Sequence, residues 1–303
     1  MRRWQLKRLL LRPFVSSRIG QDMYEWLTAI FLGTQSGMSR KWCYWFREHV
    51  VLCRRHAGFA FQGKRVWLFE PGWSLAPTIL SAVVTSCGPL ITEQHNRVAA
   101  RYLPPAIEQV EKHLDGIRRS ARAAPESQFW PAIKEAKTAE KVLQLCRAEY
   151  RVAGLPALRS IPDGSVDVCM SMGRLEHFTE DELRFIFREM RRILRPNGIG
   201  SHIVDHRDHF WHFDKSIHCF HHLTFSDAKW ASIAEGKLYR NRLMETDYAR
   251  LFEAAGFEVL SRTHELHRAD ATNVDPHTFW GPYANLTVDD LTAAVTHFVV
   301  RAA

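Results

Sequence analysis

Residues 161–200 read IPDGSVDVCMSMGRLEHFTEDELRFIFREMRRILRPNGIG, and this stretch decides the fold. The turn Pro162-Asp163-Gly164 precedes residues 165–172, whose apolar side chains predict a strand. Thr179 can cap a helix over residues 179–194, because its hydroxyl accepts a hydrogen bond from an unpaired N–H group of the first turn. Pro196-Asn197-Gly198 ends that helix. Its apolar face is formed by Leu183, Ile186, Phe187, Met190, Ile193 and Leu194.

The alternation of strands and helices continues on both sides of this stretch. Further strands are predicted at residues 65–70, 89–93, 148–153, 199–205, 258–264 and 293–302. Helices are predicted at residues 77–86, near 97–118 and 127–147, and at 243–255, while residues 206–240 are expected to be irregular. Strands separated by helices imply an α/β fold. We therefore predict a Rossmann-like, mostly parallel sheet with helices on both faces and a late antiparallel strand.

The first 58 residues differ from the rest and are predicted to form a basic helical segment or cap. Apolar side chains recur at helical spacing among residues 23–31, and a second helix is expected over residues 39–55. Residues 1–58 hold eleven Lys and Arg against three acids, whereas the remaining residues hold 30 basic and 30 acidic side chains. We thus divide the chain into residues 1–58 and a domain over residues 59–303.

This charge distribution argues against a nucleic-acid binder, which usually carries basic residues across a folded face. Basic residues with Trp4, Trp26, Trp42 and Trp45 instead suit one of two roles. The segment covers the substrate site as a cap, or it rests peripherally on an anionic membrane. The six cysteines form no CxxC pair, which favours free thiols in a reducing cytoplasm. No apolar run is long enough to span a bilayer.

Ligands on such sheets bind beyond the carboxyl ends of the strands. The first strand ends at Glu70-Pro71-Gly72, where a glycine lets the backbone turn sharply and approach a ligand. Glu93 ends the second strand, 23 residues after Glu70. An acid at about this offset of ~20 residues can accept both ribose hydroxyls of an adenosine cofactor. Trp73 is interpreted as a packing residue.

Residues 161–200 resemble the block found in class I methyltransferases, where a strand, a short loop and Leu-Glu-His precede a helix ending in Arg-Ile-Leu-Arg-Pro-Asn-Gly. Here these motifs are Leu175-Glu176-His177 and residues 192–198. The resemblance extends back to EPGWSLAPTIL, similar to the acid-x-Gly-x-Gly loop of the family, and forward to LFEAAGFEVL. Ser74 replaces the second loop glycine, and no Asp stands clearly at the third strand tip.

This resemblance implies an S-adenosylmethionine-dependent methyltransferase with a defined cofactor site. Glu70, Gly72 and Ser74 would form the loop beside the amino-acid part of the cofactor. Glu93 would bind the ribose, and Ser171, Met172 and Gly173 would line the wall near the adenine and the methyl group. Glu176 and His177 either touch a ligand or fix the start of the following helix.

Seven of the sixteen histidines fall between residues 202 and 222, namely His202, His206, His209, His212, His218, His221 and His222. They begin in the fifth strand and pass its tip. A hydroxyl acceptor must lose a proton, which His or Asp can take. We predict His206 or His209 as this base, oriented by Asp205 or Asp208. The alternatives are a polar pocket wall and a metal site, since imidazoles and carboxylates can converge on zinc.

The sequence therefore favours methyl transfer from S-adenosylmethionine to an oxygen or nitrogen of a small or medium acceptor. Two other functions stay open. The departure at Ser74 fits a catalytically silent methyltransferase-like module that binds a ligand or partner. A dinucleotide-dependent oxidoreductase would use a similar sheet, but the chain lacks the full G-x-G-x-x-G fingerprint.

Overall fold

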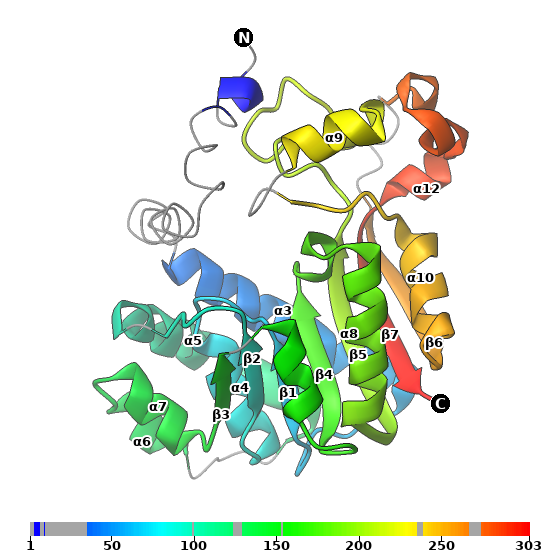
Figure 1. Ribbon diagram of the computed structural model, residues 1–303. Helices are drawn as coiled ribbons and strands as arrows, with labels where there is room; N and C mark the ends of the chain where they lie inside the picture. The colour runs from blue at the N-terminus through cyan, green and yellow to red at the C-terminus, as the bar shows by residue number, and fades with distance from the viewer. Residues whose placement is uncertain are drawn as a thin grey trace.

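The computed structural model describes residues 3–6, 9, 35–98, 100–123, 129–152, 154–234, 239–266 and 274–303. Within these residues a seven-stranded sheet has the order β3-β2-β1-β4-β5-β7-β6. Strands β1 to β5 pair in parallel, and β7 runs antiparallel to both β5 and β6. The predicted fold class is confirmed, including the late antiparallel strand (Figure 1).

The strands lie close to their predicted positions. They are β1 (Val66–Phe69), β2 (Leu90–Glu93), β3 (Glu149–Val152), β4 (Val166–Met172), β5 (Leu194–Asp205), β6 (Phe257–Leu266) and β7 (Ala293–Ala302). Only β5 differs clearly, because it begins directly at the end of the preceding helix. Asn197 takes a left-handed conformation there (φ 61°), and the register with β4 shifts between Leu194 and Ile199.

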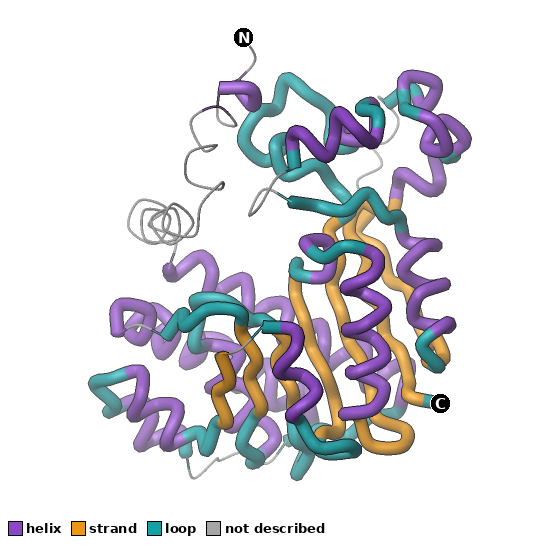
Figure 2. Tube along the Cα trace, in the orientation of Figure 1, coloured by secondary structure: helices purple, strands orange, loops and turns teal. Residues whose placement is uncertain are grey.

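Helices cover both faces of the sheet (Figures 1 and 2). One face carries α3 (Gln35–Ala57), α4 (Ala76–Thr85) and α5 (Leu103–Ala121), and the other carries α8 (Glu180–Ile193) and α10 (Glu245–Ala254). The helix predicted near 127–147 is divided into α6 (Trp130–Lys134) and α7 (Ala139–Leu145). Thr138 caps α7 through a hydrogen bond from the backbone N–H of Lys141, which explains the break.

Thr179 caps helix α8 as predicted, and Glu182 completes a capping box. The Thr179 hydroxyl accepts a hydrogen bond from the Glu182 backbone N–H, and the Glu182 side chain accepts one from the Thr179 N–H. Two unpaired donors of the first turn are thereby satisfied. The apolar face of α8 is buried, as its spacing predicts. The strand–loop–helix unit of residues 165–194 is thus held by local interactions at its turn.

Helix α3 belongs to the predicted N-terminal segment, yet it packs into the core of the sheet. Its buried side chains pack with those of α4 and α5 in one core. The buried side chains of α3 are Trp42, Cys43, Phe46, Val50, Leu52 and Cys53. His49 of α3 also contacts Ser201 in β5, with 2.7 Å between Nδ1 and Oγ. The boundary at residues 58 and 59 remains a prediction, and it would separate this helix from its own core. The apolar repeat at residues 23–31 lies outside the described residues.

A lobe rises from the carboxyl ends of the strands (Figure 1). It contains α9 (Asp227–Ile233), α12 (Val288–Thr292) and 3-10 turns at His221–Thr224, Pro276–Thr278 and Gly281–Asn285. The stretch 206–240 was expected to be irregular, so α9 corrects that prediction. Ser226 caps α9, and Trp230 and Ile233 anchor it in a small apolar cluster that also includes Trp4.

Candidate active site

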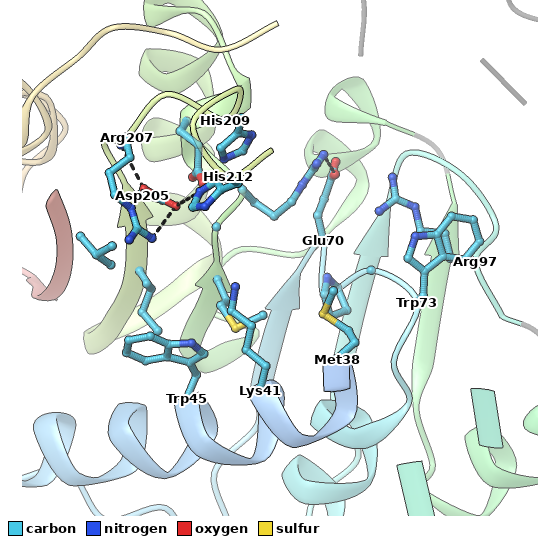
Figure 3. A pocket seen from close by; sticks show the side chains of 18 residues that line it. Met38, Lys41, Trp45, Glu70, Trp73, Arg97, Asp205, Arg207, His209 and His212 are labelled. Atoms are coloured by element: carbon cyan, nitrogen blue, oxygen red, sulfur yellow. Dashed lines mark hydrogen bonds and ion pairs between the residues drawn. The ribbon is translucent and has the colours of Figure 1, made fainter. Parts of the chain in front are cut away.

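A pocket of about 620 Å³ opens at the carboxyl ends of the central strands. Figure 3 shows α3 forming its floor with Met38, Lys41 and Trp45. Trp73 and Arg97 lie at one end and Arg207, His209 and His212 at the other, with Glu70 between them. The tips of β1, β4 and β5 complete the wall with Gly72, Met172, Gly173, Glu176, Ile203 and Asp205. The strand-tip rule therefore locates the pocket correctly.

Glu70 lies at the tip of β1 with its carboxylate buried and directed to the pocket. Its backbone has a positive φ of 49°, which is unusual for a side chain of this size and marks a constrained turn. Arg174, from the loop after β4, forms an ion pair with the carboxylate. The acid of the predicted cofactor loop thus has a cationic partner in the structure.

Glu93 lies at the tip of β2, and its side chain is 0% exposed. Its carboxylate accepts a hydrogen bond from the backbone N–H of Gly72, with an N···O distance of 2.6 Å. Arg97 lies 3.6 Å away and stacks over the ring of Trp73, 5.4 Å from its centroid. Burial raises the pKa of Glu93 to about 7, although Arg97 opposes the shift. The predicted ribose ligand is therefore held against the predicted glycine loop.

Two predicted cofactor residues take structural positions. The Ser74 hydroxyl lies 3.0 Å from that of Ser39 in α3 and accepts a hydrogen bond from the Ala76 N–H at the start of α4. The Ser171 hydroxyl is buried 2.8 Å from Nδ1 of His202. Neither residue lines the pocket, whereas Met172 and Gly173 do.

Asp205 ends β5 and is the most heavily paired acid of the pocket. The guanidinium of Arg207 donates two hydrogen bonds to it, at 2.9 and 3.0 Å, and Nε2 of His212 lies 3.2 Å away. Arg240 is 3.8 Å from the same carboxylate. Burial opposes ionisation, but His212 and the two arginines hold the pKa of Asp205 well below its usual range. Asp205 therefore orients its neighbours as a fixed anion.

The structure separates the two histidines predicted as the base. His206 is buried outside the pocket lining, with Nδ1 3.1 Å from the Leu243 carbonyl and Nε2 3.1 Å from the Thr296 hydroxyl. Burial lowers its pKa to about 4. His209 lines the pocket, and neither of its ring nitrogens has a hydrogen-bond partner among the described residues. Of the two histidines only His209 lines the pocket, and burial lowers its pKa well below its usual range as well.

Asp208 does not orient either histidine. It is buried, accepts a hydrogen bond from the Phe210 backbone N–H at 2.8 Å, and lies 3.6 Å from Nδ1 of His221. His218 and His222 lie in the same lobe, away from the pocket lining. Of the seven clustered histidines, His218, His221 and His222 thus lie in the lobe, and only His209 and His212 line the pocket.

Several pocket residues were missed by the reasoning from sequence. Arg174 and Arg207 follow strand tips and could have been found by the same rule as Glu70. Helix α3 supplies Met38, Lys41 and Trp45 from a segment that precedes the sheet, and nothing in its spacing indicates a pocket wall.

A model of the methyltransferase domain family matches residues 127–201. The match spans β3 to β5 and α8, which includes the block that the class I resemblance rested on. Residues 127–201 are therefore similar to a methyltransferase domain. The match supports the predicted methyltransferase family and enzyme class over these residues. Glu70, Gly72 and Glu93 lie before the matched segment of the methyltransferase domain, and His209 lies after it.

Solved structures resemble the methyltransferase domain only distantly. A S-adenosylmethionine-dependent methyltransferase from Methanosarcina mazei is 12% identical with a TM-score of 0.42, covering 82% of this chain and 95% of its own. A geranyl diphosphate C-methyltransferase from Streptomyces coelicolor is 9% identical with a TM-score of 0.44, covering 84% and 77%. Likenesses this distant identify neither acceptor nor mechanism. A comparison with curated proteins finds no significant match.

The described part of the chain contains no helix that is long and apolar enough to cross a membrane.

Proposed function

We propose that this domain transfers the methyl group of S-adenosylmethionine to an oxygen or nitrogen of a small or medium acceptor. The observation that carries the proposal is one continuous pocket that extends from Trp73 and Arg97, past Glu70, to His209. Methyl transfer from a sulfonium is an in-line displacement, so holding both reactants in one enclosed space supplies much of the acceleration. A volume of about 620 Å³ suits small molecules.

In this proposal the cofactor occupies the end of the pocket at β1 and β2. Glu70 and Gly72 hold its amino-acid part, Glu93 accepts hydrogen bonds from the ribose, and Met172 and Gly173 form the wall near the methyl group. Glu70 and Glu93 are ion-paired with Arg174 and Arg97 in the structure. The cofactor must therefore replace part of these pairings, and either arginine can then turn to its carboxylate.

The acceptor occupies the other end, beside His209 and the Asp205–His212 pair. The bond between sulfur and methyl breaks as the acceptor oxygen or nitrogen bonds to the methyl carbon. S-adenosylhomocysteine leaves as a neutral thioether. In the simplest form His209 takes the proton that the acceptor releases, because its nitrogens have no other partner among the described residues. His206, which the sequence equally suggested, has both nitrogens occupied.

The first test is calorimetric binding of S-adenosylmethionine and S-adenosylhomocysteine to the full chain. We expect micromolar binding that Glu93→Gln weakens by at least about tenfold, since a hydrogen bond to a charged group contributes about 1.5–3 kcal/mol. Glu108→Gln, at an exposed acid of α5, is the matched control and should bind normally. Normal binding by Glu93→Gln would remove the ribose assignment.

The second test concerns acceptor chemistry and uses labelled S-adenosylmethionine with a panel of small hydroxyl, amine and carbon acceptors. His209→Ala should retain cofactor binding and lose about 10²- to 10⁴-fold in rate, the usual contribution of a general base. An unchanged rate in that variant would reject the role of His209. Transfer to carbon alone would reject an oxygen or nitrogen acceptor.

A catalytically silent module is the second candidate, and the paired arginines favour it. Arg97 and Arg174 already compensate the two acids that a cofactor would use. If neither S-adenosylmethionine nor S-adenosylhomocysteine binds to a folded sample, this candidate replaces methyl transfer. The search would then turn to partners of the pocket.

The N-terminal segment leaves a separate choice between a cap and a membrane contact. The cap is supported by α3, whose Met38, Lys41 and Trp45 line the pocket. The apolar repeat before α3 lies outside the described residues. If the protein sediments with anionic vesicles but not with neutral ones, the peripheral membrane contact is supported instead.

A further inference from the structure

Glu176 is a buried acid whose charge is not compensated by a hydrogen bond. It follows β4 in the turn Leu175–His177, is 2% exposed, and lines the pocket. Neither of its carboxylate oxygens has a hydrogen-bond partner within the described residues. Buried carboxylates are normally hydrogen-bonded or bound to a cation, because an uncompensated one is costly. Glu176 has a distant ion pair with Arg240, at 4.0 Å, but no hydrogen bond, so its oxygens can accept a closer ligand.

A hydrogen bond to a backbone carbonyl fixes the tautomer of His177, so that its other ring nitrogen can bind a metal. Its Nδ1 lies 3.0 Å from the carbonyl oxygen of Tyr239. A carbonyl only accepts hydrogen bonds, so Nδ1 carries the proton and Nε2 keeps its lone pair. Metal-binding histidines are commonly fixed in this way, with one nitrogen donating to a carbonyl and the other facing the ion.

His209 completes a convergent group. Its ring centroid lies 5.0 Å from that of His177. One potential ligand atom each from Glu176, His177 and His209 lies within 4.8 Å of the others. In a tetrahedral zinc site, with bonds of about 2.0–2.2 Å, the ligand atoms are about 3.3 Å apart. Small rotations of the three side chains would close that difference.

We propose that Glu176, His177 and His209 bind one divalent transition-metal ion, with Zn²⁺ as its representative. Two imidazoles and one carboxylate form a ligand set typical of catalytic zinc sites, which keep a fourth position open. Here the open position faces the pocket, because Glu176 and His209 both line it. An oxygen or nitrogen of the acceptor can occupy that position.

A second group, Asp205, His209 and His212, also has ligand atoms within 4.8 Å of one another. It is the weaker site because both Asp205 oxygens already accept hydrogen bonds from Arg207. Arg240 is the nearest competing cation of Glu176, at 4.0 Å, and it also lies 3.8 Å from Asp205. When a metal takes Glu176, Arg240 still has Asp205 as a partner.

This inference deepens the proposed function but does not depend on it for its test. With a metal bound, His209 activates the acceptor through the ion, which makes a bound hydroxyl more acidic. The His212–Asp205 pair is then the nearest group to take the proton. If the protein binds Zn²⁺ but not S-adenosylmethionine, the proposed methyl transfer is refuted and the metal site is not. The opposite result would refute the metal site alone.

The test is titration of the metal-free full chain with Zn²⁺ by calorimetry, and with Co²⁺ by visible absorption. We expect one equivalent of Zn²⁺, the intense visible bands of four-coordinate Co²⁺, and a higher Tm with Zn²⁺ present. Glu176→Gln, His177→Ala and His209→Ala should each weaken binding by about 100-fold or more, since even a lost outer partner costs about 10- to 100-fold. His113→Ala, on an exposed face of α5, should bind normally.

Three outcomes overturn the proposal. The first is that the unmodified protein shows neither Zn²⁺ binding nor a Zn²⁺-dependent shift in Tm. This outcome does not depend on whether any variant folds. The second is equal binding by Glu176→Gln. The third is binding that His212→Ala abolishes while His177→Ala leaves it intact, because the ion would then lie in the Asp205 group.

Discussion

The carboxylate of Glu93 accepts a hydrogen bond from the backbone N–H of Gly72 at 2.6 Å, which joins the tip of β2 to the loop after β1. The same carboxylate is fully buried, and its pKa is raised to about 7, chiefly by burial. The loop and the acid are therefore one unit. The affinity of a ligand that contacts either the loop or the acid should therefore depend on the charge of Glu93.

Cofactor affinity should depend on pH through Glu93. Above pH 7 the ionised carboxylate accepts hydrogen bonds from ribose hydroxyls, and below pH 7 it is increasingly protonated and loses acceptor capacity. We expect S-adenosylmethionine to bind up to about tenfold more weakly at pH 6 than at pH 8, because protonation then opposes binding. Calorimetry at both pH values checks this. In Glu93→Gln the difference should vanish, and an equal dependence there would assign it to another group.

His206 should stabilise the fold and contribute little to catalysis. His206→Ala removes hydrogen bonds to Leu243 and Thr296 and leaves buried partners unsatisfied. Its free energy of unfolding should fall by about 2–4 kcal/mol, measured by urea denaturation. Cofactor affinity per folded molecule should stay unchanged. If His206→Ala instead keeps its stability and loses rate, the base assignment returns to His206.

Three histidines buried against the sheet, His49 and His297 on the α3 side and His202 on the α10 side, should make stability fall in mild acid. Burial lowers the pKa of His202 and His297 to about 3, and lowers that of His49 well below its usual range. The unfolded chain takes up protons below about pH 6.5 while these folded-state histidines do not. Each therefore removes about 1.4 kcal/mol of stability per pH unit as pH falls from 6 toward 4.

Urea denaturation at pH 7, 6 and 5 measures that slope. In His297→Gln the free energy of unfolding should fall less steeply with decreasing pH, by about 1.4 kcal/mol per pH unit, because one buried neutral histidine is removed. His113→Ala, at an exposed position, should keep the slope of the unmodified protein. Equal slopes in all three proteins would contradict neutral burial of His297.

Ser74 should serve the packing of α3 and α4. Ser74→Gly restores the second glycine of the family loop but removes contacts to Ser39 and Ala76. We expect a loss of about 1–2 kcal/mol in stability and no gain in S-adenosylmethionine affinity. Ser74→Ala separates the lost hydroxyl from the added backbone freedom. Clearly tighter cofactor binding by Ser74→Gly would show that the serine restricts the loop.

Local signals made most of the sheet predictable. Thr179 caps α8 as predicted, and the alternation of strands and helices predicted a mostly parallel sheet with helices on both faces. Helix α9 was missed because residues 206–240 have no apolar period, and α9 instead depends on its cap and on Trp230. Periodicity cannot reveal an element that is fixed by contacts distant in sequence.

The candidate site was predicted only where its residues follow strand ends. Glu70, Gly72, Met172, Gly173, Asp205 and His209 all lie where the tip of a parallel strand places them. His206 and His209 could not be told apart, because only packing decides which histidine is turned to the pocket. Lys41 and Trp45 were out of reach, since the register of α3 on the sheet is a tertiary property.

Helix α3 connects two regions that would otherwise be independent. Near its start Met38, Lys41 and Trp45 form the pocket floor, and one turn further His49 lies against Ser201, which in turn contacts His297 at 2.8 Å. A protein shortened to begin at residue 59 would lose both, so its failure to bind a ligand would say nothing about the sheet's own capacity. Mutations that shift α3 along its axis would move the pocket floor. They would therefore change ligand preference without altering any residue at a strand tip.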